Sequence, residues 1–133
     1  MKPNRTSILA IRDLAGTHED EPVVMLNLNR YHAGSGFPAS GVYREYMEAL
    51  EALLEEVGAH ILWRSAIRDQ PVGEPAHDEV LAVWYPSHQA FIDLQRAPGA
   101  EENFRLREQA VNNAVIHRCS GDVAPLDKPG APR

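Results

Sequence analysis

The segment 23–31 constrains the fold most, because it is predicted to be a strand whose two faces differ in chemistry. Side chains along a strand alternate between the two faces of a sheet. One face has the composition of a packed core and consists of Val24, Leu26 and Leu28. The other face carries two amides where a packing face usually has aliphatic residues, and consists of Met25, Asn27 and Asn29. The pattern predicts that the apolar face meets the helices, and that the asparagines lie opposite, along a pocket or a wet interface.

Helical and extended patterns alternate along the rest of the chain. Apolar residues at three- and four-residue spacing predict an amphipathic helix that begins after Ser40 and ends at Gly58. The expected elements are, in order, a short helix over 6–14, a strand over 23–31, the helix just named, strands over 59–68 and 79–85, a short helix after Ser87, a helix over 104–113 and a strand over 114–119.

This order is β-α-β-β-α-β with an extra helix in front, which is typical of an α+β fold of the ferredoxin-like kind. We expect a lead-in with the N-terminal helix over residues 1–21 and one domain over 22–119. The last segment, 120–133, is rich in proline and lacks periodicity, so we expect an extended or disordered tail.

Composition and charge exclude several classes of function. The 133 residues suffice for one domain with a core. The net charge of −6, from 19 acidic and 13 basic residues, disfavours nucleic acid and anionic membranes as partners. The single cysteine, Cys119, excludes an internal disulfide. No signal peptide and no membrane span of roughly 18 apolar residues is visible, which predicts a cytoplasmic protein.

Three segments carry a resemblance to a known family. They are the strand Pro22–Tyr31, the helical segment Tyr43–Tyr46 and the strand-to-helix junction Asp78–Ser87. In this order they resemble an uncharacterised family of dimeric α/β-barrel proteins, related to EthD-like proteins, antibiotic-biosynthesis monooxygenases and muconolactone isomerases. The resemblance spans about residues 6–119, and Asn29 and 31–32 depart from the usual family residues.

The resemblance implies a homodimer in which the two sheets face each other as a barrel. Two crossover helices cover only one face of a four-stranded sheet, and a second copy is a common cover for the other. The resemblance implies no particular reaction, because one fold can support several chemistries.

Polar and aromatic residues near the asparagines are candidates for substrate binding. An amide offers both a donor and an acceptor, so Asn27 and Asn29 could bind a carbonyl or hydroxyl of a small molecule. They could equally satisfy backbone groups or bind water. Tyr46 could close a pocket or cover the sheet edge, and Trp84 could face the dimer interior or pack in the core.

The second strand carries His60, Arg64 and Arg68 at even positions, which predicts one basic face. Arg64 could hold a carboxylate or enolate, and His60 titrates near neutral pH. The alternative is pairing with carboxylates across a dimer, or exposure. His117 in the last strand is the second candidate base, on condition that it faces the lumen.

The six histidines show no spacing typical of metal ligands, so the sequence indicates no metal and no cofactor. Arg107 is expected to pair with a carboxylate such as Asp78 at the sheet edge, a structural role.

Two functions remain open at this stage. The first is a cofactor-independent isomerase or monooxygenase acting on an aromatic or polyketide-like compound, with His60 or His117 as base and Asn27, Asn29 and Arg64 stabilising the negative charge. The second is a non-catalytic binding or accessory homodimer without a substrate pocket. The first predicts a closed, mostly apolar cavity, and the second a filled seam between two sheets.

Overall fold

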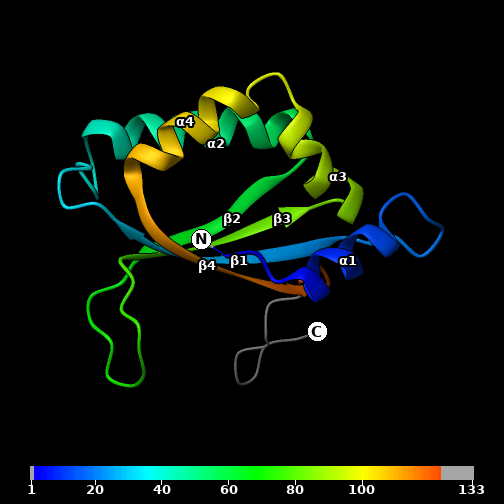
Figure 1. The fold of residues 1–133 in the computed structure, drawn as a ribbon, viewed down its shortest axis with the longest axis horizontal. Coiled ribbons are helices and arrows are strands. Elements are labelled where there is room, and N and C mark those ends of the chain that lie inside the picture. The colour runs from blue at the N-terminus through cyan, green and yellow to red at the C-terminus, as the bar shows by residue number, and fades with distance from the viewer. Residues whose placement is uncertain (1, 124–133) are drawn as a thin grey trace, which may run out of the picture.

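A computed structural model describes residues 2–123 of the chain (Figure 1). Part of the tail expected over 120–133 therefore lies outside the described residues. The elements are, in order, α1 (Arg5–Leu14), β1 (Val23–Tyr31), α2 (Gly41–Glu56), β2 (His60–Ala66), β3 (Glu79–Tyr85), α3 (His88–Asp93), the short 3₁₀ helix η1 (Leu94–Arg96), α4 (Ala100–Ala110) and β4 (Val111–Ser120). No helix among the described residues is long and apolar enough to cross a membrane.

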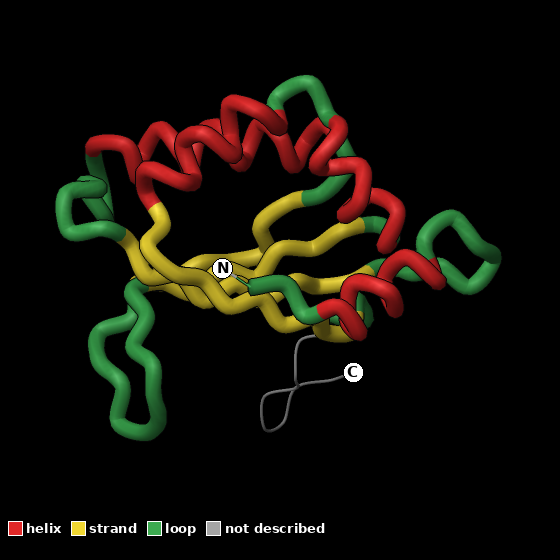
Figure 2. The backbone as a smooth tube through the Cα atoms, in the orientation of Figure 1, coloured by secondary structure: helices red, strands yellow, loops and turns green. Residues whose placement is uncertain are grey.

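The four strands form one antiparallel sheet in the order β2-β3-β1-β4. Strand β3 lies between β1 and β2, as in the split β-α-β units of a ferredoxin-like fold. Helices α2 and α4 lie together over one face of the sheet, and α3 continues this layer at one end (Figures 1 and 2). The prediction of an α+β chain with a four-stranded antiparallel sheet is confirmed.

The helix-facing side of the sheet carries the asparagines, so the predicted assignment of faces is wrong. Met25 and Leu81, both nearly inaccessible, belong to the core beneath α2 and α4. Asn27 pairs with Leu81 across β1 and β3 and therefore shares this face. Asn29 is 3% exposed on the same side. The prediction failed because the opposite face is also apolar, so apolarity alone could not identify the side that meets the helices.

The opposite side of the sheet, here called the outer face, carries few polar groups. The register places on it Val24, Leu26, Leu28, Trp63, Val80, Ala82, Trp84 and Val115, together with Arg30, His60, Ser65, Asn113, His117 and Cys119. Trp63 is 52% exposed, and no described helix covers this face (Figure 2). Among these fourteen side chains, Arg30 is the one permanently charged group, and it is exposed near the end of β1.

A bulge in β2 separates two residues that strict alternation would place together. His60 pairs with Trp84 on the outer face, whereas Arg64 pairs with Leu81 on the helix-facing side. The register shifts between Ile61 and Trp63, so one extra residue lies between the two halves of the strand. The predicted basic face of His60, Arg64 and Arg68 is therefore wrong, and Arg68 lies beyond the end of β2.

The ends of the helices follow local sequence signals to different degrees. Gly58 has a φ of +75° two residues after α2, in the left-handed conformation that glycine adopts most easily, which confirms the predicted end. Helix α4 begins at Ala100, earlier than the predicted 104, and β4 begins at Val111, directly after it. Because no glycine or proline separates the two elements, the sequence did not mark this boundary.

A partly buried carboxylate fixes the loop between α1 and β1 to the start of α3. Asp20 accepts hydrogen bonds from the backbone N–H groups of Gly16, His88 and Gln89, at 3.1, 2.7 and 3.2 Å. Its Oδ1 also lies 3.1 Å from Nδ1 of His88. Burial opposes ionisation of Asp20, but these hydrogen bonds outweigh it and lower its pKa from 3.8 to about 2. The ionised carboxylate thus caps the N-terminus of α3.

Candidate functional site

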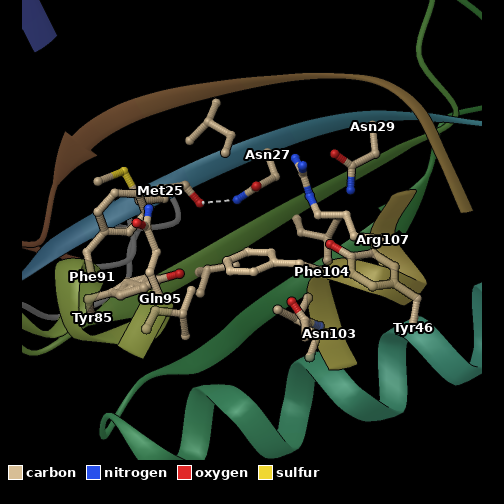
Figure 3. Close-up of a pocket in the computed structure, with 15 residues that line it drawn as sticks. Met25, Asn27, Asn29, Tyr46, Tyr85, Phe91, Gln95, Asn103, Phe104 and Arg107 are labelled. Atoms are coloured by element: carbon tan, nitrogen blue, oxygen red, sulfur yellow. Dashed lines mark hydrogen bonds between the residues drawn. The ribbon is translucent and has the colours of Figure 1, made fainter. Parts of the chain in front are cut away.

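A cavity of about 210 Å³ lies between the sheet and the helical layer (Figure 3). Most of its wall is apolar, and six side chains with polar groups come from the strand β1 and the helical layer. It is lined by Met25, Asn27, Asn29, Tyr46, Leu50, Leu81, Val83, Tyr85, Phe91, Leu94, Gln95, Asn103, Phe104, Arg107 and Ile116. Pockets for small molecules typically have volumes from about 300 Å³ upward. This cavity therefore fits a small ligand with one or two polar groups.

Tyr46 and Arg107 form a hydrogen-bonded pair in the cavity wall. The Arg107 guanidinium donates to the Tyr46 hydroxyl, and Tyr46 is 4% exposed. Burial raises the pKa of this hydroxyl, and the opposing effect of Arg107 is smaller, so Tyr46 keeps its proton at neutral pH. In Figure 3 the Arg107 side chain extends toward Asn27 and Asn29. The pair thus offers a cation and an O–H donor to an oxygen atom inside the cavity.

Both asparagines of β1 use their amide nitrogen within the protein. Nδ2 of Asn27 donates to the carbonyl oxygen of Met25 at 3.0 Å, and Nδ2 of Asn29 donates to the hydroxyl of Tyr31 at 3.2 Å. Oδ1 of Asn29 is buried and has no hydrogen-bond partner. A buried acceptor without a donor is uncommon in folded proteins and costs stability.

Behind Asn29, a buried carboxylate sets the direction of the hydrogen bonds. Glu79, 4% exposed, accepts from the hydroxyls of Tyr31 and Tyr43, at 2.6 and 2.7 Å. Burial, reinforced by Glu79, raises the pKa of both hydroxyls, so both keep their protons. Since Tyr31 has one proton and gives it to Glu79, its oxygen must accept from Asn29. The ring of Phe37 packs against both tyrosines, with centroids 4.9 and 5.0 Å away.

Helix α4 contributes two polar side chains one turn apart, Asn103 and Arg107. Asn103 is 2% exposed, and its Nδ2 is buried without a partner. Residues four apart lie on the same face of a helix, so both can face one ligand. The strand side of the cavity therefore presents an unpartnered acceptor, and the helix side presents donors.

The structure separates the residues that the sequence pattern grouped as a site. Asn27, Asn29 and Tyr46 line the cavity together. His60 and Trp84 lie on the outer face, with ring centroids 5.2 Å apart.

The other two predicted site residues also lie away from this wall. His117 pairs with Leu26 and is exposed on the outer face. Arg64 is exposed at the edge strand and lines a shallow depression beside α2. The two predicted bases are therefore on the side of the sheet opposite to the cavity.

Sequence reasoning missed the role of Arg107, Asn103 and Glu79. Arg107 was expected to pair with Asp78, whose carboxylate instead accepts from the backbone N–H of Tyr31 at 2.8 Å. One signal was available, since Asn103 and Arg107 share a helix face with the buried Leu106 and Ala110. Polar residues within a buried helical stripe indicate a polar patch in the interior.

No family model matches this sequence, and no curated protein matches it. Solved structures do match. A protein of unknown function from Rhodopseudomonas palustris aligns with a TM-score of 0.72 at 23% identity, over 93% of this chain and 97% of that one. Its methylated form aligns with a TM-score of 0.68 at 26% identity, over 98% and 96%.

A more distant match bears on the fold class. A dabb family protein with a ferredoxin-like fold from Mesorhizobium loti aligns with a TM-score of 0.51 at 11% identity, over 80% of this chain and 99% of that one. These likenesses identify the fold as ferredoxin-like, shared with structures of unknown function, and they assign no activity.

Proposed function

We propose that this chain binds a small, largely apolar molecule and holds its negatively charged oxygen between Tyr46 and Arg107. The observation that carries the proposal is the Tyr46–Arg107 hydrogen bond in the wall of a mostly apolar cavity. An arginine in a site of low dielectric attracts an oxyanion strongly, and the protonated Tyr46 adds a second donor. The apolar wall, with Phe91 and Phe104, suits an aromatic or other flat carbon skeleton.

The catalytic form of this proposal is an isomerase or monooxygenase acting next to a carbonyl of an aromatic or polyketide-like compound. In this form Tyr46 and Arg107 stabilise the enolate oxygen. Among the described residues, however, no aspartate, glutamate or histidine lines the cavity. Because proton abstraction needs a base, we favour ligand binding over catalysis for the described part of the chain. The relation to EthD-like proteins and monooxygenases remains part of the proposal.

Binding of benzoate, measured by isothermal titration calorimetry, tests the proposal. Benzoate is flat, apolar over most of its surface and carries one oxyanion. Arg107→Gln should weaken binding about tenfold or more, because it removes a charged donor. Arg105→Gln is the matched control, since Arg105 lies on the same helix, is exposed and pairs with Glu102 at 2.9 Å. Failure of benzoate to bind, or equal loss in both variants, would contradict the proposed site.

We further propose that the chain acts as a cytoplasmic homodimer in which two outer faces pack together as a barrel. The support is the chemistry of the outer face, which includes Leu26, Leu28, Trp63 and Trp84. Among the described strand residues of this face, Arg30 is the one permanently charged group, and it lies exposed near the end of β1. Two copies can therefore meet over the apolar residues without burying an unpaired charge, provided that Arg30 stays at the rim. A monomer would leave this apolar surface in water.

A further inference from the structure

We propose that the ligand of this cavity carries a hydroxyl group beside its oxyanion, with the oxyanion on the α4 side and the hydroxyl donating to Asn29. The inference rests on the proposed function and narrows the ligand to a class, the small hydroxy-substituted aromatic or enolic acids. It is carried by the unpartnered Oδ1 of Asn29 on the cavity wall.

Only the oxygen end of the Asn29 amide is available to a ligand, because its nitrogen is already bonded. Glu79 accepts the only proton of the Tyr31 hydroxyl, so the Tyr31 oxygen can receive a hydrogen bond only from an N–H group. Nδ2 of Asn29 supplies it. Rotating the amide by half a turn would place Oδ1 against the Tyr31 oxygen, two acceptors facing each other. The chain from Glu79 through Tyr31 therefore holds Asn29 as an acceptor toward the cavity.

Asn27, two residues earlier on β1, also has its amide oxygen left as an acceptor, for a separate reason. Nδ2 of Asn27 donates to a backbone carbonyl, which can only accept. The oxygen of the Asn27 amide therefore points away from that contact. Strand β1 thus offers two amide oxygens on one side of the cavity, both fixed by bonds made on their nitrogen atoms.

The helix side has the opposite polarity. Arg107 carries only donors, and Nδ2 of Asn103 is a buried donor without a partner. A ligand lying between α4 and β1 makes the most hydrogen bonds when it accepts them from α4 at one end and donates one to β1 at the other. A simple carboxylate without a hydroxyl would leave Oδ1 of Asn29 unpaired, whereas a hydroxy acid would satisfy both sides.

The test compares benzoate, the three hydroxybenzoates and the matching methoxybenzoates by titration calorimetry. The methyl ethers keep the oxygen and remove its proton, so they separate donation from size. We expect at least one hydroxybenzoate to bind about tenfold more tightly than both benzoate and its own methyl ether. Asn29→Leu should remove this preference, so that each hydroxybenzoate binds no more tightly than its own methyl ether.

Two controls keep the outcomes distinct. Asn112→Leu makes the same change on an exposed residue outside the cavity, and it should leave the hydroxyl preference intact. A thermal melt of Asn29→Leu verifies that the variant is folded. Should the variant not fold, the comparison of hydroxybenzoates with their methyl ethers on the unchanged protein decides the inference alone.

Each possible result bears on one of the two proposals. Suppose that benzoate binds and Arg107→Gln weakens it, but no hydroxybenzoate binds more tightly than benzoate. This inference would then be overturned, and the proposed function would stand. A methyl ether that binds as well as its parent would also overturn it. If none of the acids binds at millimolar concentration, the proposed function falls and this inference with it.

Discussion

The hydroxyl of Tyr31 on β1 donates a hydrogen bond of 2.6 Å to Oε1 of Glu79 on β3, and both side chains are buried. A second tyrosine, Tyr43 of α2, donates to the other oxygen of the same carboxylate. Two strands and a helix are thereby joined at one carboxylate, which reaches Asn29 of the cavity wall through Tyr31.

Removal of the Tyr31 hydroxyl should destabilise the protein. Tyr31→Phe leaves Oε1 of Glu79 and Nδ2 of Asn29 without their partner, and we expect the free energy of unfolding to fall by about 2 kcal/mol. Urea denaturation measures this change. Tyr85→Phe is the matched control, because Tyr85 is 4% exposed but its hydroxyl makes no hydrogen bond to a described residue. Its loss should be below about 0.5 kcal/mol, and equal losses in both variants would contradict the role of the network.

Stability should depend on pH through Asp20. Its pKa is lowered from 3.8 to about 2 in the folded chain, so folding favours the ionised form. The resulting stabilisation is fully present above pH 4 and is lost as the pH falls toward 2. Asp20→Asn should therefore lower the free energy of unfolding at pH 7 by about 1 kcal/mol, the usual effect of losing a helix cap.

The difference between the Asp20→Asn variant and the unchanged protein should shrink as the pH falls from 4 to 2. Denaturation at a series of pH values measures it. Asp13→Asn, which changes an exposed aspartate of α1, should show no such convergence. A difference that stays constant over this range would mean that ionisation of Asp20 is not the cause.

The two histidines predicted as bases should not affect the ligand. His60→Ala and His117→Ala change the outer face, on the other side of the sheet from the cavity, so benzoate affinity should stay within about twofold of the unchanged protein. A large loss of affinity in either histidine variant would refute the placement of the site.

Tyr46→Phe, in contrast, should weaken benzoate binding by about tenfold, since it removes an O–H donor from the cavity.

A charge placed on the outer face should separate the proposed dimer. Leu28→Lys introduces an ammonium group that the packed sheets would have to bury unpaired, and sedimentation should then detect a monomer. Leu9→Lys provides the comparison, because Leu9 is a 45% exposed leucine on α1. The Leu9→Lys variant should therefore remain a dimer. A monomer in the unchanged protein at micromolar concentration would refute the assembly.

The fold was predictable from the sequence because its evidence is local. Gly58 ended α2 where expected, and the periodicities of β1, α2 and β3 sufficed to order the elements. The relation between faces was not predictable, because it depends on long-range pairing. Val24, Leu26 and Leu28 form an apolar face that meets no described helix, and only the complete sheet distinguishes it from the core face.

The candidate site was predicted in part. Asn27, Asn29 and Tyr46 were singled out, although on the wrong side of the sheet, and they line the cavity. His60 and Arg64 were grouped with each other by strict alternation, which the bulge in β2 breaks. His117 was a candidate on condition that it faced the lumen, and Trp84 was expected in the dimer interior or the core; both lie on the outer face. Arg107 was missed because a single arginine on a helix is usually paired at the surface.

The bulge in β2 also bears on how the chain tolerates changes in length. Strand β2 lies at the edge of the sheet, and its one extra residue falls between two halves that are already in register with β3. Deletion of Leu62 would join these halves without turning any other side chain to the opposite face. A one-residue deletion in β1, at the centre, would invert the side chains beyond it and exchange the cavity wall with the outer face. Homologous chains that differ by one residue in a strand should therefore differ in β2.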